Sequence, residues 1–328
     1  MKDVTTPTLT VVLVCPTGRR TLHRTLTAIA AQTIAAQIEV LVASTDDDFD
    51  TAEQRLVSRL QSLRVFRQDG IANVDHAAAR LLLLAQAPIV ASIEDHAYPD
   101  PDWAENLLAQ YDETCVSVGS AMLNANPNAA LSWSNMLIAY GQWTEATPAG
   151  DIAWVALHNG TYRRSALEPF GDDLWRLFNR ESEVLVRMRD AGGTFRFAPN
   201  ARIRHLNPSK LAATAKLRFD AGRLTAANRW RHEGWGWPKR LFYAALGPLI
   251  PFVRYRKMRG ELFGKRPDVT EAKHGPALLI GLIFDGAGQI AGFLAGPGGA
   301  RDRLAVFEMD RMEHLNQRDR RAFSPVTG

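Results

Sequence analysis

The stretch Pro88–Trp103, PIVASIEDHAYPDPDW, decides the fold of this chain. Its first half is an apolar run after a proline, which predicts a short buried strand. Glu94, Asp95 and His96 follow directly, and two further prolines prevent a helix from beginning before the second of them. We therefore expect the two acids and the imidazole in a loop at the carboxyl end of a strand, where open α/β sheets bind their ligands.

Spacing alone leaves two interpretations of Glu94, Asp95 and His96 open. Carboxylate oxygens beside an imidazole suit Mn²⁺ or Mg²⁺ better than a metal that prefers thiolates. The same residues can instead be solvated loop residues that precede and cap the helix expected from Pro101. Both interpretations stand at this point, because a motif this short also occurs by chance.

The chain of 328 residues is long enough to bury a sizeable core, in one large domain or two modest ones. Its composition shows no sign of disorder. Cys15 and Cys115 lie in apolar runs without the spacing of metal ligands, which indicates core residues in a reducing compartment. The run that ends at Cys15 is too short for a secretory signal. We therefore expect the chain in the cytoplasm or on the inner face of a membrane.

Apolar runs and helical patterns alternate along the first part of the chain. Strands are expected at residues 9–14, 38–43, 63–66, 115–119 and 194–198, besides the strand in the opening stretch. Helices are expected from about residue 17 to 30, at 51–63, 74–84 and 177–188, and a polar turn at 158–164. Strands that alternate with helices predict a parallel sheet with right-handed crossovers.

Three further features have both a structural and a functional interpretation. Residues 129–143 are rich in aromatic side chains, which either stack on a sugar or fill a core, and core filling is commoner. The acids at 46–48 either bind a ligand or cap the next helix. Arg19 and Arg20 gain a function only if a diphosphate binds beside them.

The alternation stops after His205, and the following segment is basic. Residues 201–266 contain sixteen Lys and Arg against three acids. A basic block indicates an anionic partner surface, either nucleic acid or anionic lipid. A basic helix is expected at 211–230 and an apolar segment at 241–253, which is shorter than the roughly 20 residues that span a bilayer.

Tryptophans and cations flank this apolar segment, which favours an element lying in the interface of an anionic membrane leaflet. The residues expected to associate with the membrane are Trp235, Trp237, Lys239, Arg240, Arg254, Arg256 and Lys257. A nucleic-acid partner is not expected, because the basic block encloses leucines and prolines. The alternative is a hairpin buried within the protein. Residues 276–296 are long enough to cross a membrane, but Asp285 and Gln289 favour a re-entrant or interfacial position.

The order of these parts resembles that of the family 2 glycosyltransferases, which have the GT-A fold. The likeness covers roughly residues 9–205. It rests on a first strand ending in Cys15-Pro16-Thr17, on Ala31-Gln32-Thr33 before the second strand, on Glu94-Asp95-His96 with Pro99 and Trp103, on Tyr162-Arg163-Arg164, on a helix with Glu181, Arg187 and Gly192, and on residues 199–205.

The resemblance implies a fold class, and the pattern of the remaining residues adds a second domain. The fold class is α/β, with a Rossmann-like mixed sheet of the GT-A type flanked by helices, to which the basic and apolar segments after residue 205 add a helical, membrane-associating C-terminal region. Residues 1–208 would form the catalytic domain that binds the nucleotide-sugar. Residues 209–328 would form the basic helical region with interfacial or re-entrant apolar segments.

The resemblance also implies a set of site residues. Glu94, His96 and His205 stand where the family binds a divalent cation, Mn²⁺ or Mg²⁺, and Glu181 stands where it has the catalytic base. The residues implied to bind the donor are Pro16, Thr17, Arg19, Ser44, Asp46, Glu94, Asp95 and Arg187. Ser44 occupies the place of the acid that usually holds the nucleobase, so either Asp46 or Asp47 substitutes for it or the base is recognised in another way.

The expected activity is inverting transfer of a single sugar from a nucleoside-diphosphate-sugar to a lipid-linked or cell-surface glycan acceptor, on the cytoplasmic face of the cell membrane. Polymerisation is not expected, because Ala226 stands where processive synthases have a glutamine before Arg229 and Trp230. Two alternatives are a catalytically silent, membrane-bound scaffold of a glycan-assembly complex and a nucleotidyltransferase, which would release pyrophosphate. The oligomeric state is not predicted.

Overall fold

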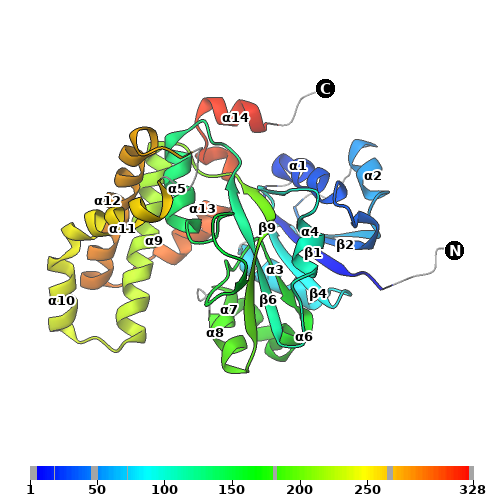
Figure 1. Ribbon diagram of the computed structural model, residues 1–328, viewed down its shortest axis with the longest axis horizontal. Helices are drawn as coiled ribbons and strands as arrows, with labels where there is room; N and C mark the ends of the chain where they lie inside the picture. Colours follow the sequence, from blue (N-terminus) through cyan, green and yellow to red (C-terminus); the bar gives the residue numbers. More distant parts are fainter. Residues whose placement is uncertain are drawn as a thin grey trace. The chain divides into compact units, whose positions relative to one another are not determined.

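A computed structural model describes residues 6–17, 19–45, 51–71, 73–179, 183–263 and 269–324 (Figure 1). The chain forms two compact units. The sheet unit comprises Met1–Ala125, Trp143–His205 and Ser324–Gly328, and the helical unit comprises Asn126–Gln142 and Leu206–Phe323. The division made from the sequence differs, since it assigned residues 126–142 and 206–208 to the first domain and residues 324–328 to the second.

The first half of the sheet consists of four parallel strands in the order β3-β2-β1-β4. Their bounds are Leu9–Cys15 for β1, Ile38–Ser44 for β2, Ser62–Arg67 for β3 and Ile89–Glu94 for β4. β1 and β2 are buried throughout, as their apolar runs predict. The register aligns Cys15 with Ser44 and Val14 with Glu94, so the carboxyl ends of these strands meet at one edge.

The second half makes the sheet mixed. The described strands continue in the order β4-β8-β6-β9-β5, with β7 paired to β9. These strands are β5 (Ala97–Pro99), β6 (Cys115–Asn124), β7 (Gly150–Asp151), β8 (Gly160–Arg163) and β9 (Thr194–His205). β6 and β9 are parallel, whereas β8 runs antiparallel to β4 and β6, and β5 runs antiparallel to β9. The mixed sheet of the expected fold class is therefore observed.

Several expected elements differ in extent. The polar turn expected at 158–164 contains strand β8, and the strands expected at 115–119 and 194–198 continue into β6 and β9. The helix expected at 51–63 ends at Val57, although Leu60 beyond it is buried as expected. The helix expected at 177–188 is represented by two shorter helices, and residues 180–182 lie outside the described part of the chain.

Helices flank the sheet. The helices of the sheet unit are α1 (Arg19–Ala30), η1 (Ala35–Gln37), α2 (Thr51–Val57), α3 (Val74–Leu83), α4 (Trp103–Leu108), α6 (Arg164–Leu167), η2 (Glu168–Asp173), α7 (Leu174–Asn179) and α8 (Glu183–Asp190). Leu22, Leu26 and Ile29 of α1 are fully buried, so the helical spacing of these residues correctly predicts the face that packs in the core.

The helical unit is organised around α9 and α12, two long helices in close contact (Figure 1). Its described helices are α5 (Ala130–Tyr140), α9 (Leu211–His232), α10 (Trp237–Ala245), η3 (Gly247–Leu249), α11 (Ile250–Leu262), α12 (Glu271–Ala295), α13 (Ala300–Glu308), η4 (Arg311–His314) and α14 (Gln317–Phe323). Trp133, Met136 and Leu137 of α5 are buried, so core filling explains the aromatic-rich stretch. Packing of α5 on α12 explains why residues 126–142 belong to this unit.

Among the described residues, α12 is the single helix that is long and apolar enough to cross a membrane. Half of its apolar stretch is buried within the protein. Core helices of soluble proteins share this length and composition. Asp285 of α12 is buried, forms an ion pair with Arg254 and accepts a hydrogen bond from Gln289 at 2.7 Å. The entry of residues 276–296 into a membrane therefore stays a prediction.

The expectation that Trp235 associates with a membrane surface is wrong. Its side chain is buried and stacks on Tyr243 and Phe293, with ring centroids 4.4 and 5.9 Å apart. Its indole N–H donates a hydrogen bond of 2.6 Å to Glu233. Trp235 is thus a core residue of the helical unit, because its ring fills the space between α10 and α12.

The contact between α9 and α12 provides a stability prediction. A Cβ atom added to Gly288 would lie 2.0 Å from the backbone oxygen of Phe219, so Gly288→Ala forces the two helices apart. We expect this change to lower the free energy of unfolding by about 1–3 kcal/mol. Gly260→Ala on α11 is the matched control, because no atom of another element in the described part of the chain lies within 4 Å of the added Cβ. The control is expected to be neutral or slightly stabilising in chemical denaturation, and equal effects of both changes would contradict this packing.

Candidate metal and donor site

Three side chains with metal-binding atoms converge in the sheet unit. Glu94 is the last residue of β4, His96 follows it in the turn before β5, and His205 is the last residue of β9. The pairing of β5 with β9 sets Ala97 opposite His205. This register brings the two imidazole rings together, with their centroids 4.9 Å apart in an edge-to-face arrangement.

The distances between these side chains are short enough for one shared ion. The Glu94 carboxylate lies 3.2 Å from Nε2 of His205 and 3.7 Å from Nε2 of His96. The candidate ligand atoms of all three residues lie within 4.8 Å of one another. Both histidines are buried, and Glu94 is partly buried. One carboxylate oxygen and two imidazole nitrogens are a donor set that suits a divalent transition metal.

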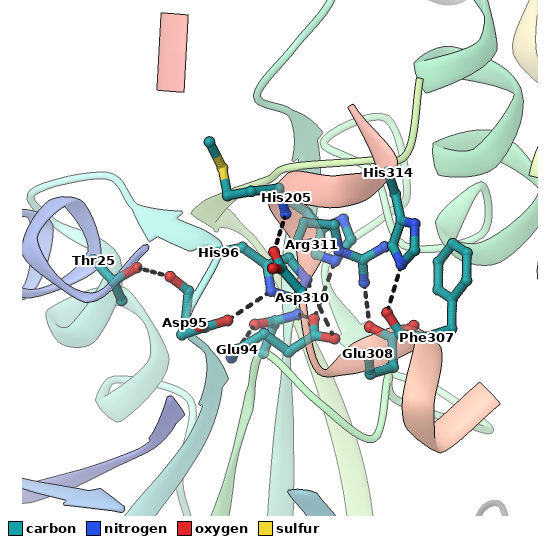
Figure 2. Close-up of polar contacts among 12 residues, drawn as sticks. Thr25, Glu94, Asp95, His96, His205, Phe307, Glu308, Asp310, Arg311 and His314 are labelled. Atoms are coloured by element: carbon teal, nitrogen blue, oxygen red, sulfur yellow. Dashed lines mark hydrogen bonds and ion pairs between the residues drawn. The ribbon is translucent and has the colours of Figure 1, made fainter. Parts of the chain in front are cut away.

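The hydrogen bonding of His96 fits a metal ligand. Its Nδ1 lies 2.8 Å from the carboxylate of Asp95 (Figure 2). Because an ionised carboxylate only accepts, the proton of the neutral ring resides on Nδ1 and leaves a lone pair on Nε2. That Nε2 is buried and has no hydrogen-bond partner among the described residues. A carboxylate behind a ligating histidine is the usual way in which the ring is oriented toward a metal.

Asp95 is held in place by α1. The hydroxyl of Thr25 donates a hydrogen bond of 2.6 Å to the backbone oxygen of Asp95 (Figure 2). The loop after β4 is therefore tied to a helix that packs on the sheet. The observed contact makes Asp95 a positioning residue for His96, and its predicted contact with the donor stays a prediction.

Asn159 belongs to the site, although sequence reasoning did not assign it a role. It is fully buried and adopts a left-handed conformation with φ of 63°. Its side-chain oxygen accepts a hydrogen bond of 3.1 Å from the backbone N–H of Glu94, and its amide nitrogen donates to the Glu94 carboxylate. The Asn-Gly pair at 159–160 was the available signal, because asparagine tolerates this conformation better than most residues.

The charges around Glu94 keep it ionised. Burial by itself raises the pKa of the Glu94 carboxyl, but its electrostatic interactions with His205 and His96 outweigh burial and hold the pKa well below its usual range. Glu94 is therefore a carboxylate at neutral pH. It can bind a cation without first losing a proton.

The other predicted site residues are only partly placed. Pro16 and Thr17 form the turn after β1, and Ser44 is the buried last residue of β2, at the same sheet edge as Glu94. Arg187 lies on α8, where it is exposed and forms an ion pair of 2.8 Å with Glu183. The predictions for Asp46, Glu181 and the side chain of Arg19 fall outside the described residues.

Neither a protein-family model nor a curated protein matches the sequence. Solved structures with a similar arrangement include a mannosyltransferase from Pyrobaculum calidifontis in complex with GDP-Man and Mn²⁺, with a TM-score of 0.48 and 17% identity over 92% of this chain and 79% of that one. Another is S. aureus TarS in complex with UDP, with a TM-score of 0.43 and 13% identity over 89% of this chain and 91% of that one. At these values neither likeness establishes a family, a ligand or an activity for this chain.

The bond between Asp95 and His96 leads to a prediction for metal affinity. Asp95→Asn replaces the acceptor behind Nδ1 with an amide that holds the imidazole less firmly, so we expect Mn²⁺ affinity to fall by about 10–100-fold. Asp100→Asn is the matched control, because Asp100 lies directly after β5 and pairs with Arg202 and Arg204, at 3.2 and 3.0 Å. Calorimetric titration with Mn²⁺ measures both, and an equal loss in the two variants would refute the positioning role.

Proposed function

We propose that the chain is an inverting, metal-assisted glycosyltransferase, which moves a single sugar from a nucleoside-diphosphate-sugar to a lipid-linked or cell-surface glycan acceptor. The observation that carries the proposal is the convergence of Glu94, His96 and His205 at the carboxyl edge of a mixed α/β sheet. Ligands of open α/β sheets bind at this edge. The donor class and the single transfer come from the sequence resemblance to the family 2 glycosyltransferases.

The three side chains of the cluster would hold a divalent cation. When bound, the cation would neutralise the donor diphosphate and stabilise the departing nucleoside diphosphate as a Lewis acid. Two imidazoles among the three ligands favour Mn²⁺ over Mg²⁺, which prefers oxygen ligands. Asp95 and Asn159 keep His96 and Glu94 oriented toward the shared position.

The reaction needs a base on the acceptor side. The acceptor oxygen attacks the anomeric carbon, the bond from that carbon to the diphosphate oxygen breaks, and the configuration inverts. Glu181, assigned by the resemblance, would take the proton of the acceptor hydroxyl. The products are the glycosylated acceptor and a nucleoside diphosphate.

A screen of donor hydrolysis tests this function and separates it from the alternatives. The full chain is incubated with UDP-, GDP- and dTDP-sugars, with and without Mn²⁺, and the products are identified by mass spectrometry. We expect release of a nucleoside diphosphate that depends on the metal. A parallel incubation with nucleoside triphosphates and a sugar 1-phosphate would release pyrophosphate if the chain were a nucleotidyltransferase. Absence of both turnover and nucleotide binding would favour the scaffold, for which the replacement of the usual base-binding acid by Ser44 is the supporting observation.

A further inference from the structure

Large apolar side chains are exposed along one continuous segment of the helical unit. The segment comprises residues 237–257 and includes α10, η3 and most of α11; we refer to it as the exposed segment. Its exposed large hydrophobic residues are Trp237, Leu241, Phe242, Leu246, Leu249, Phe252 and Val253. Phe242 and Phe252 are each 60% exposed and Val253 is 67% exposed. Large apolar side chains that gather in an exposed stretch are typical of an interaction site.

The inner side of the exposed segment is fixed to α12. Gly247 lies so close to α12 that a Cβ added to it would be 2.1 Å from the side chain of Ile290. Pro251 lies against Gly286 of α12, where an added Cβ would be 3.0 Å from the proline ring. Ala244 of α10 is buried in the cluster around Trp235 and Phe293. The segment is therefore anchored from within by small residues. Its larger apolar side chains remain on the opposite side.

The outward residues follow helical periodicity. Leu249, the N-cap of α11, and Phe252, Val253 and Arg256 within α11 are spaced at i, i+3, i+4 and i+7, which places them on one face of the helix. All four are exposed. This face is apolar in its first turn and basic in the next. An amphipathic element with this arrangement typically lies flat in the interface of a membrane.

Basic side chains border the apolar residues, and they differ in whether the protein itself already binds their charge. Arg254 forms an ion pair with Asp285, and Arg240 donates hydrogen bonds of 2.8 and 3.2 Å to the last carbonyls of α12. Arg256 and Lys257 are exposed and form no ion pair with any residue in the described part of the chain. These two cations are therefore available to an external anionic partner.

We propose that the exposed segment docks onto the surface of an anionic lipid bilayer, with its apolar side chains among the headgroups and upper acyl chains and Arg256 and Lys257 on lipid phosphates. Charge complementarity selects this occupant. A second copy of the chain would bring like charges together, and a nucleic acid would leave Phe242 and Phe252 against a polar backbone. The docking is independent of the metal site, so its failure would leave the proposed activity untouched.

Vesicle flotation of the full chain tests this proposal. The protein is mixed with phosphatidylcholine vesicles that either contain or lack phosphatidylglycerol, at low and high salt. We expect binding to the anionic vesicles, a loss of about 10-fold or more with Arg256→Glu plus Lys257→Glu, and weakening by salt. Phe242→Ser plus Phe252→Ser should also abolish flotation. Val306→Ser on α13 is the control, since Val306 is 66% exposed outside the segment.

Circular dichroism of each variant verifies that the exposed substitutions leave the fold intact. Three results would overturn the proposal: absence of flotation with anionic vesicles, flotation that the two double variants retain, or an equal loss in Val306→Ser. Light scattering gives a fourth result that would overturn the proposal. A concentration-dependent dimer that both double variants abolish would identify a second copy of the chain, and not a bilayer, as the occupant.

Discussion

Glu94→Gln is expected to lower the affinity for Mn²⁺ by about 100-fold or more and to remove metal-dependent release of nucleoside diphosphate. Loss of a residue that hydrogen-bonds to a metal ligand already lowers metal affinity by about 10–100-fold, and Glu94 is itself a candidate ligand. It is also the one carboxylate in the cluster of Glu94, His96 and His205. Glutamine keeps the shape of the side chain but removes the negative charge that the cation requires.

Glu105→Gln is the matched control for this change. Glu105 lies on α4 of the same unit and accepts a hydrogen bond of 2.9 Å from Thr33. Glu105→Gln should therefore leave Mn²⁺ affinity unchanged. Calorimetry with Mn²⁺, with circular dichroism to verify folding, measures the difference. Wild-type affinity in Glu94→Gln would mean that the cluster is not the metal site.

Glu181→Gln is expected to reduce turnover by about 10²–10⁴-fold while nucleotide binding stays unchanged. The reason is that a general base acts on the acceptor proton and not on the donor. Asp190→Asn is a suitable control, because Asp190 is an exposed acid at the end of α8. Steady-state kinetics with a donor from the hydrolysis screen, and calorimetry with the matching nucleotide, separate the two effects. Unchanged turnover would remove Glu181 from the mechanism.

The parallel half of the sheet could be predicted from the sequence because its strands are buried on both faces. Such strands appear as continuous apolar runs, and the runs at 9–14 and 38–43 correspond to β1 and β2 within one residue at each end. β8 was interpreted as a turn, since Gly160–Arg163 is polar and contains no apolar run. β5 is three residues long and ends at Pro99, which is typical of an edge strand that leaves almost no signal.

The candidate site, like the sheet, could be predicted from the sequence only in part. The convergence of Glu94, His96 and His205 was expected from the resemblance to the family 2 glycosyltransferases, and the strand pattern alone predicted only that Glu94 and His96 follow the carboxyl end of a strand. The register of Ala97 with His205 could not be predicted, since β5 itself was not predicted. Neither could the bonds of Asn159 to Glu94, which connect residues 65 positions apart. Trp235 is the opposite case, because a tryptophan beside basic residues has the same local sequence pattern whether it is exposed or stacked in a core.

Anomalous diffraction at the manganese absorption edge tests the central claim most directly. Crystals of the full chain are soaked with Mn²⁺ and with UDP or GDP. The metal-assisted transferase predicts one strong anomalous peak between Glu94, Nε2 of His96 and Nε2 of His205, with the nucleotide diphosphate in contact with it. An ordered nucleotide without a peak at these three residues, or a peak elsewhere in the molecule, would contradict it.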